Sequence, residues 1–330
     1  MRIVVIAPNW LGDAVMALPA IADLRHHYAA AHLAIAARPP VSPLFTMVKG
    51  VDELVGLPGR WRVNAPELAA GAFDIAVLLP NSFATALIAK NAKIPERWGF
   101  ATDFRGWLLT RGLSRPTGTT HQSEYYQALT TGLGIPIGPA FATVWPDANR
   151  ARQILTNVGL DLDEPFVVLA PGAAYGRAKQ WLPERFAQLA DLLINERGWS
   201  VLMVGSNADR SACAEVAARL PATGTRINRL IDLSGKTDLP ALAGVLQLAR
   251  AVVSNDSGAM HLAGAVGTKV VAIFGATNET RTSPLSAGVD APRPAIISHE
   301  VFCRPCMLRE CPIDHRCMSG ISAARVFEAL

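Results

Sequence analysis

The sequence predicts an α/β protein made of two Rossmann-like domains. Short β-branched runs, typical of strands buried on both faces, recur in both halves of the 330 residues. Each run leads into a glycine-containing loop and then a helical pattern, which favours parallel sheets. A proline- and glycine-rich linker over 132–146 separates the halves. We expect domains over 1–147 and 148–330, facing each other across a cleft.

The N-terminal half supplies the first set of elements. Its strands are rich in valine, isoleucine and alanine, and its first loop contains Gly12. The predicted order is a strand over 2–7, a loop over 8–13, a helix over 14–28, and strands over 32–36 and 75–79.

The C-terminal half repeats this order. Its buried runs again end in small polar or glycine residues, so each strand is predicted to open into a loop. The predicted elements are helices over 148–158, 183–197 and 259–266, and strands over 166–170, 200–204, 252–253 and 270–274.

Composition excludes several classes of protein. Half of the residues are hydrophobic and 18% are charged, which excludes intrinsic disorder. A net charge of +4 is too small to indicate a nucleic-acid binder. The stretch most like a membrane span, 259–276, contains His261 and Lys269. We expect a cytoplasmic protein, peripheral to a membrane at most.

The loop after the first strand contains Asp13, at the start of the first helix. Ligands bind outside the carboxyl ends of parallel strands, so this carboxylate is a candidate general base. The alternative is an aspartate that only caps the helix.

The loop after the 166–170 strand contains Gly172, Tyr175, Gly176, Arg177 and Lys179. Glycines that expose backbone N–H groups, with two cations before a helix, predict a diphosphate cradle. The spacing matches neither a P-loop nor a dinucleotide-binding glycine motif. A solvated loop is the alternative.

The stretch Ser254–His261 follows another strand and opens a helix. Asp256, Ser257 and the N–H of Gly258 lie where a helix N-terminus stabilises phosphate. Thr277, after the next strand, is expected to reach the same anion. The alternatives are a capping Asp256 and a core His261.

These loops together resemble the ADP-heptose:lipopolysaccharide heptosyltransferases of glycosyltransferase family 9, most of all their heptosyltransferase II type. The resemblance covers nearly the whole chain in order. The segments that carry it are PNWLGDAVMALPAI at 8–21, LLPNSFATALIA at 78–89, IPERWGF at 94–100, PGAAYGRAKQWLPERFAQLA at 171–190 and VSNDSGAMHLAGAVGTKVVAIFGATN at 253–278.

The resemblance implies the GT-B architecture and an inverting transfer of heptose from ADP-heptose to the inner core of lipopolysaccharide. It implies that Asp13 is the base and that Lys179 stabilises the leaving ADP. With Lys179 and helix N-termini neutralising the diphosphate, no cofactor or catalytic metal is expected. The donor is assigned to Gly172, Tyr175, Lys179, Thr237, Asp256, Ser257, Gly258 and His261.

The acceptor is expected to meet the N-terminal domain. Residues 90–115 interleave basic and aromatic side chains, which suits the anionic Kdo sugars and phosphates of Kdo–lipid A at a membrane surface. A solvated loop is the alternative reading of this segment. The residues assigned to the acceptor are Asn81, Ser82, Arg97 and Arg105.

Four of the five cysteines crowd into the last thirty residues. Their spacing allows a structural zinc site of four cysteines, or of three cysteines and His315; it also allows disulfides or plain reduced thiols. We expect a structural cluster that fixes the loop after the last strand. The residues are Cys303, Cys306, Cys311 and Cys317.

Other functions stay open at this point. A nicotinamide oxidoreductase lacks support, because no GxGxxG follows the first strand. A non-catalytic nucleotide-sugar-binding protein and a heptosyltransferase with another acceptor are the remaining alternatives.

Overall fold

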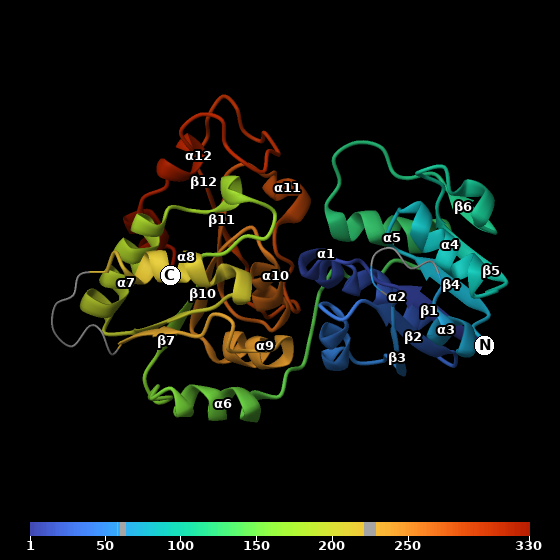
Figure 1. The fold of residues 1–330 in the computed structure, drawn as a ribbon, viewed down its shortest axis with the longest axis horizontal. Helices are drawn as coiled ribbons and strands as arrows, with labels where there is room; N and C mark the ends of the chain where they lie inside the picture. The colour runs from blue at the N-terminus through green and yellow to red at the C-terminus, as the bar shows by residue number, and fades with distance from the viewer. Residues whose placement is uncertain (58, 60–63, 221–228) are drawn as a thin grey trace. The chain divides into compact units, whose positions relative to one another are not determined.

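The computed structural model describes residues 1–57, 59, 64–220 and 229–330. The chain divides into two compact units, Met1–Trp145 and Pro146–Leu330. The sequence puts the boundary two residues later, after 147. Among the described residues each unit contains one six-stranded sheet whose strand pairs are all parallel. Figure 1 shows the N-terminal unit in blue to green and the C-terminal unit in green to red.

The N-terminal sheet has the strand order β3-β2-β1-β4-β5-β6. The order reverses between β1 and β4, and such a switch point is where ligands bind in doubly wound sheets. Its strands are β1 (Arg2–Ile6), β2 (His32–Ala37), β3 (Glu53–Gly56), β4 (Ile75–Leu78), β5 (Glu96–Phe100) and β6 (Arg111–Leu113). Its helices are α1 (Leu11–Met16), α2 (Leu18–His27), η1 (Ser42–Met47), α3 (Pro66–Ala70), α4 (Phe83–Asn91), η2 (Gly106–Leu108) and α5 (Gln122–Gly132).

The C-terminal sheet has the equivalent order β12-β11-β10-β7-β8-β9, with its switch point between β7 and β10. Its strands are β7 (Phe166–Ala170), β8 (Ser200–Met203), β9 (Leu230–Asp232), β10 (Ala251–Asn255), β11 (Val270–Phe274) and β12 (Ala295–Ser298). Its helices are α6 (Ala148–Asn157), η3 (Arg177–Lys179), α7 (Pro183–Arg197), η4 (Asn207–Asp209), α8 (Arg210–Ala217), α9 (Leu239–Leu248), α10 (Gly258–Ala265), α11 (Glu279–Thr282), α12 (Arg316–Ser319) and α13 (Ala323–Glu328).

Each sheet packs against its helices through an apolar core. In the C-terminal unit β7, β10 and β11 are buried along their whole length, and α7 packs on α8 and α13. Helix α6 lies along α9, as Figure 1 also shows. The rigid central strands therefore fix the loops at their carboxyl ends, where the candidate residues lie.

Two predictions about local structure are wrong. The single helix expected over 14–28 is two helices, because Pro19 near the start of α2 cannot continue a helix from the preceding turn. The solvated loop that was the alternative interpretation of segment 90–115 is wrong, because this segment contains the paired strands β5 and β6. Among the described residues no helix is long and apolar enough to cross a membrane.

Candidate active site

The C-terminal unit brings three of the residues singled out in the sequence into one network. The Lys179 ammonium donates to Asp256 Oδ2 at 2.6 Å, and Thr277 Oγ1 donates to the same oxygen at 2.7 Å. The Lys179 and Asp256 side chains are 14% and 5% exposed. A charge pair this buried needs close mutual hydrogen bonding to offset its loss of hydration. The Lys179 ammonium is thereby held at a fixed position.

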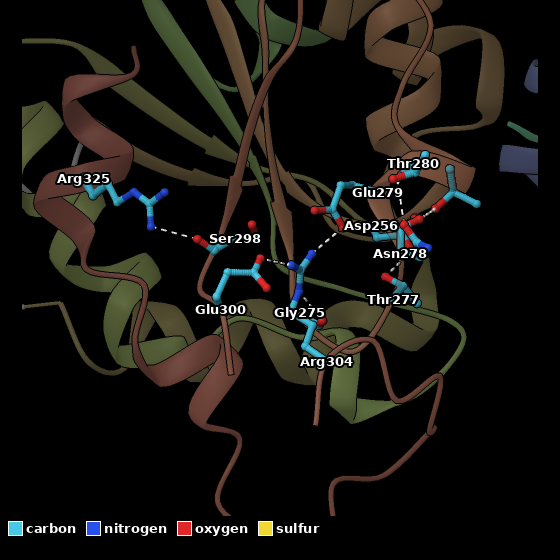
Figure 2. Close-up of polar contacts among 11 residues, drawn as sticks. Asp256, Gly275, Thr277, Asn278, Glu279, Thr280, Ser298, Glu300, Arg304 and Arg325 are labelled. Carbon is cyan, nitrogen blue, oxygen red and sulfur yellow. Dashed lines mark hydrogen bonds and ion pairs between the residues drawn. The ribbon is translucent and has the colours of Figure 1, made fainter. Parts of the chain in front are cut away.

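Three loops at the carboxyl edge of the sheet make this network. Lys179 lies on the loop after β7, Asp256 follows β10, and Thr277 follows β11. These strands are neighbours in the sheet, so their loops meet at the switch point between β7 and β10. Figure 2 shows Asp256 beside Thr277 and the start of α11.

Asn255, the last residue of β10, holds both ends of the loop that follows β7. Its amide donates to the carbonyl of Pro171 at 2.8 Å and accepts from the backbone N–H of Trp181 at 2.9 Å. Asn255 is fully buried. The sequence analysis gave Asn255 no role of its own. The available signal was an asparagine at the end of a buried strand, because a buried amide must hydrogen-bond to a neighbouring loop.

The glycines of the β7 loop are needed for close approach. A Cβ on Gly172 would lie 2.1 Å from Asp209 Oδ1, and one on Gly176 would lie 2.3 Å from the carbonyl oxygen of Arg309. Asp209 itself accepts from the backbone N–H of Ser206 at 2.8 Å. The loop is therefore packed tightly on its neighbours and is not the solvated loop of the alternative interpretation.

Neither alternative for Asp256 and Asp13 as helix caps matches the structure. The N-cap position of α10 is occupied by Ser257, whose side chain makes no capping hydrogen bond and whose hydroxyl lies 3.0 Å from that of Ser254. The residue before α1 is Trp10, and Asp13 lies inside its first turn. His261 is buried within α10, and Gly258 is the first residue of that helix. Thr237 lies after β9, at the outer edge strand of the sheet.

The cysteine-containing tail reaches over the same loops. Tyr175 Oη donates to the carbonyl of Met307 at 3.0 Å, and Ala178 N–H donates to that of Arg309 at 2.9 Å. Met307 N–H donates to the carbonyl of Ala276 at 2.8 Å. The tail thus bridges the loop after β7 and the loop after β11.

Arg304 also fixes the tail in place, and Figure 2 shows its contacts. Its guanidinium, 4% exposed, forms ion pairs with Glu279 and with Glu300, the latter at 2.6 Å, and donates to the carbonyl of Gly275 at 3.0 Å. Sequence reasoning missed Arg304. An arginine between two cysteines, with glutamates nearby along the chain, was the available signal.

All five cysteines are free thiols in this structure. The four tail cysteines line one small cavity with Asp314 and Arg316, so they do gather as expected. Within the described residues, however, no group of three or more His, Cys, Asp or Glu side chains is placed to hold a metal. The structural zinc site allowed by the spacing is therefore unsupported. Burial raises the pKa of the separate Cys213 thiol to about 12.

In the N-terminal unit, the candidate base and two of the candidate acceptor residues lie at the switch point between β1 and β4. Asp13 follows β1, and Asn81 and Ser82 follow the adjacent β4. Asp13 is half-buried. Its charge contributes to the raised pKa of the nearby Tyr126 hydroxyl, which lies well above its usual value mainly because Tyr126 is buried. Asn81 donates to Tyr125 Oη at 2.7 Å.

Ser82 caps α4, accepting from the N–H of Thr85 at 3.3 Å. Its hydroxyl also lies 2.7 Å from that of Thr85. Ser82 thus has a clear structural role at the start of α4, and its assignment to the acceptor stays a prediction.

Both arginines that the sequence analysis assigned to the acceptor donate their hydrogen bonds to backbone carbonyls of the protein itself. Arg105 is fully buried, and its guanidinium donates to the carbonyls of Phe100, at 2.9 Å, and Pro80. Arg97 donates to the carbonyls of Leu108 and Ile94, at 2.7 and 2.5 Å. Burial lowers the pKa of Arg105 to about 10, so it stays charged at neutral pH. This geometry favours structural roles for both, and acceptor binding by them stays a prediction.

Two sheets with the same doubly wound order are the arrangement of the GT-B fold, and solved structures with this fold match the chain over its whole length. The structure of Escherichia coli ADP-heptose lipopolysaccharide heptosyltransferase II is 28% identical, with a TM-score of 0.84, over 100% of this chain and 97% of that chain.

The chain belongs to glycosyltransferase family 9 (heptosyltransferase), whose model matches residues 61–316. It is 31% identical to lipopolysaccharide heptosyltransferase 2 of Salmonella typhimurium over 87% of this chain and 86% of that protein. The same identity and coverage hold for lipopolysaccharide heptosyltransferase 2 of Escherichia coli K12. The protein is therefore a glycosyltransferase, and the oxidoreductase and non-catalytic alternatives are excluded.

Proposed function

We propose that this enzyme transfers a heptose from ADP-heptose to the inner core of lipopolysaccharide, as a heptosyltransferase of type II. The relatives named above, each matched over most of its length, support both the donor and the acceptor class. The observation that carries the proposal is the Lys179–Asp256–Thr277 network at a sheet edge where a nucleotide is expected.

In the donor unit, Lys179 is the residue that meets the diphosphate. Its ammonium is oriented by Asp256 and lies 4.8 Å from the centre of the Tyr175 ring. An ammonium keeps three donors, so pairing with Asp256 leaves capacity for phosphate oxygens. The N-terminus of α10, at Ser257 and Gly258, adds further N–H donors. This end of the sheet therefore offers several N–H donors to the oxygens of a diphosphate.

In the acceptor unit, Asp13 acts as the base. The acceptor hydroxyl oxygen attacks the anomeric carbon of the heptose while its proton passes to the Asp13 carboxylate. The bond from that carbon to the ADP oxygen breaks, and ADP leaves with the electron pair, so the configuration inverts. Charge grows on the diphosphate as this bond lengthens, and Lys179 stabilises it.

The acceptor is Kdo–lipid A carrying inner-core sugars, so the enzyme works in the cytoplasm beside the membrane surface. A protein with this task needs no metal if Lys179 carries the charge neutralisation. Turnover that is lost in EDTA and restored by magnesium would contradict that part of the proposal.

The test is incubation of the purified chain with ADP-heptose and Kdo–lipid A acceptors that carry no heptose or one heptose. We expect the mass of one heptose to be added to the one-heptose acceptor. Addition only to the acceptor without heptose would assign a different acceptor position, and no product with either would overturn the proposal.

A further inference from the structure

One region of the N-terminal unit exposes aromatic side chains that its core does not use. Phe104 is 95% exposed and Trp107 is 67% exposed, at and just before η2. Phe83, at the start of α4, is 38% exposed and lies with its ring centre 6.1 Å from that of Trp107. Large apolar side chains gathered at a surface in this way mark a site of interaction.

The backbone holds Phe104 out into solvent. Asp103 and Phe104 have φ angles of +50° and +56°, a left-handed conformation that bulky side chains rarely adopt. The next residue, Arg105, fixes the turn from inside, because its buried guanidinium donates to the carbonyls of Phe100 and Pro80. A strained turn held by a buried anchor indicates that the exposed tip has a use.

The surroundings of this tip are basic. The Lys90 ammonium lies 4.6 Å from the centre of the Trp107 ring. Between residues 83 and 115 the sequence has six basic and two acidic side chains, so this segment carries a charge of +4, equal to that of the whole chain. The rest of the chain is therefore neutral on balance, and its positive charge is concentrated here.

We infer that Phe83, Phe104 and Trp107, with Lys90, form a docking surface for an anionic lipid bilayer; this inference rests on the proposed function, which puts the acceptor in a membrane. Exposed aromatic rings beside lysine match the composition that proteins use at the headgroup level of a bilayer. A basic segment is attracted to the anionic lipids of the cytoplasmic leaflet. Phe104 is almost fully exposed, which fits insertion into lipid better than capture of a protein segment.

The test measures binding to vesicles that contain no acceptor, so it does not depend on transfer. The probes are vesicles of phosphatidylcholine with about a third phosphatidylglycerol, and pure phosphatidylcholine vesicles, in a flotation assay at low salt. Wild-type protein is expected to float with the anionic vesicles and much less with the neutral ones. Failure of the wild-type protein to float with anionic vesicles overturns the inference.

The variants are Phe104→Asn, because asparagine tolerates the left-handed backbone, and Trp107→Ser. Removing either ring is expected to weaken vesicle binding about tenfold or more. The matched controls are Phe302→Asn, at an 80% exposed ring beside Arg316, and Trp145→Ser, at a ring 4.3 Å from Lys49. Equal losses in the controls, or no loss in the variants, overturn the inference.

A parallel assay separates this inference from the proposed function. Transfer to a deacylated, water-soluble acceptor is expected to be unchanged in Phe104→Asn and Trp107→Ser. If both variants lose this transfer as strongly as they lose vesicle binding, the rings bind the acceptor sugars and not a bilayer. If the wild-type protein binds vesicles but transfers nothing to any acceptor, the docking surface stands and the proposed function fails.

Discussion

The carboxyl edges of the two sheets share one topology but hold their candidate residues differently. In the C-terminal unit, Lys179 is locked by Asp256, which Thr277 also contacts, in nearly complete burial. In the N-terminal unit, Asp13 is half-buried on a helix of six residues. A cation that stabilises a leaving group must stay in place, whereas a base must exchange its proton with substrate and solvent. The same fold therefore supports a rigid edge and an accessible one.

The sharpest test of this contrast is Asp13→Asn. Loss of the base is expected to reduce kcat about 100-fold or more, while ADP affinity stays unchanged because the donor edge belongs to the other unit. Kinetics and ADP titration measure the two quantities. The control is Glu67→Gln, an exposed carboxylate at the start of α3. A normal kcat in Asp13→Asn would make Asp13 structural.

At the rigid edge, Lys179→Met is expected to weaken ADP binding about 10- to 100-fold, through loss of a charge-assisted contact. It also leaves the buried Asp256 without its cation, which lowers the free energy of unfolding. Calorimetric ADP titration and urea denaturation measure these effects separately.

The double variant Lys179→Met with Asp256→Asn separates the two roles of the lysine. It is expected to regain stability but not ADP affinity, because the buried charge is gone while the diphosphate still lacks its partner. Arg185→Gln, at a half-buried arginine of α7 that donates to Gln188 at 3.0 Å, serves as the control. Recovery of ADP affinity in the double variant would show that Lys179 only balances Asp256.

In the N-terminal unit, Arg105→Met is expected to lower the free energy of unfolding by about 2 kcal/mol, because buried carbonyls lose a charged donor. Arg97→Met is expected to lose about 1 kcal/mol or less, since Arg97 is only half-buried. Urea denaturation gives both values. Unchanged stability with a raised acceptor KM would instead restore the acceptor-binding role that the sequence suggested for these arginines.

A comparably small effect is expected at Arg304, which contacts the segment beside the proposed donor loops through the carbonyl of Gly275. Arg304→Met is expected to raise the donor KM about tenfold, with kcat nearly unchanged, and Arg304→Lys to recover part of it. The control is Arg325→Met, whose guanidinium donates to the carbonyl of Ser298 at 2.8 Å, also drawn in Figure 2. Equal effects at Arg325 would mean that Arg304 supports the unit in general and not the donor loops.

The central strands could be predicted because their apolar runs are continuous. The predicted 166–170 and 270–274 strands match β7 and β11, both buried along their whole length. Strands such as β6 and β12 could not, because edge strands are short and carry polar or exposed residues. Sheet order was also needed to place Asp256 next to the loop of Lys179, 77 residues earlier.

Side-chain roles were harder to predict than strands. Arg105 looks like a surface cation in the sequence, but the carbonyls that bury it come from Pro80, 25 residues away, as well as from its own turn. The same limit applies to Arg304, whose partner Glu279 is also 25 residues distant. Charge and spacing therefore identify candidate cations, while the tertiary fold decides which of them have donors left for a ligand.

The bridge formed by Met307 and Arg309 also has a consequence for biosynthesis. The loop after β7 obtains hydrogen-bond partners from a segment more than a hundred residues later in the chain. Trp181 likewise donates to the carbonyl of Ile321 at 3.0 Å. A nascent chain that still lacks residues 301–330 therefore has a β7 loop without these partners. Ribosome-bound intermediates are expected to acquire ADP binding only after this segment has left the ribosome.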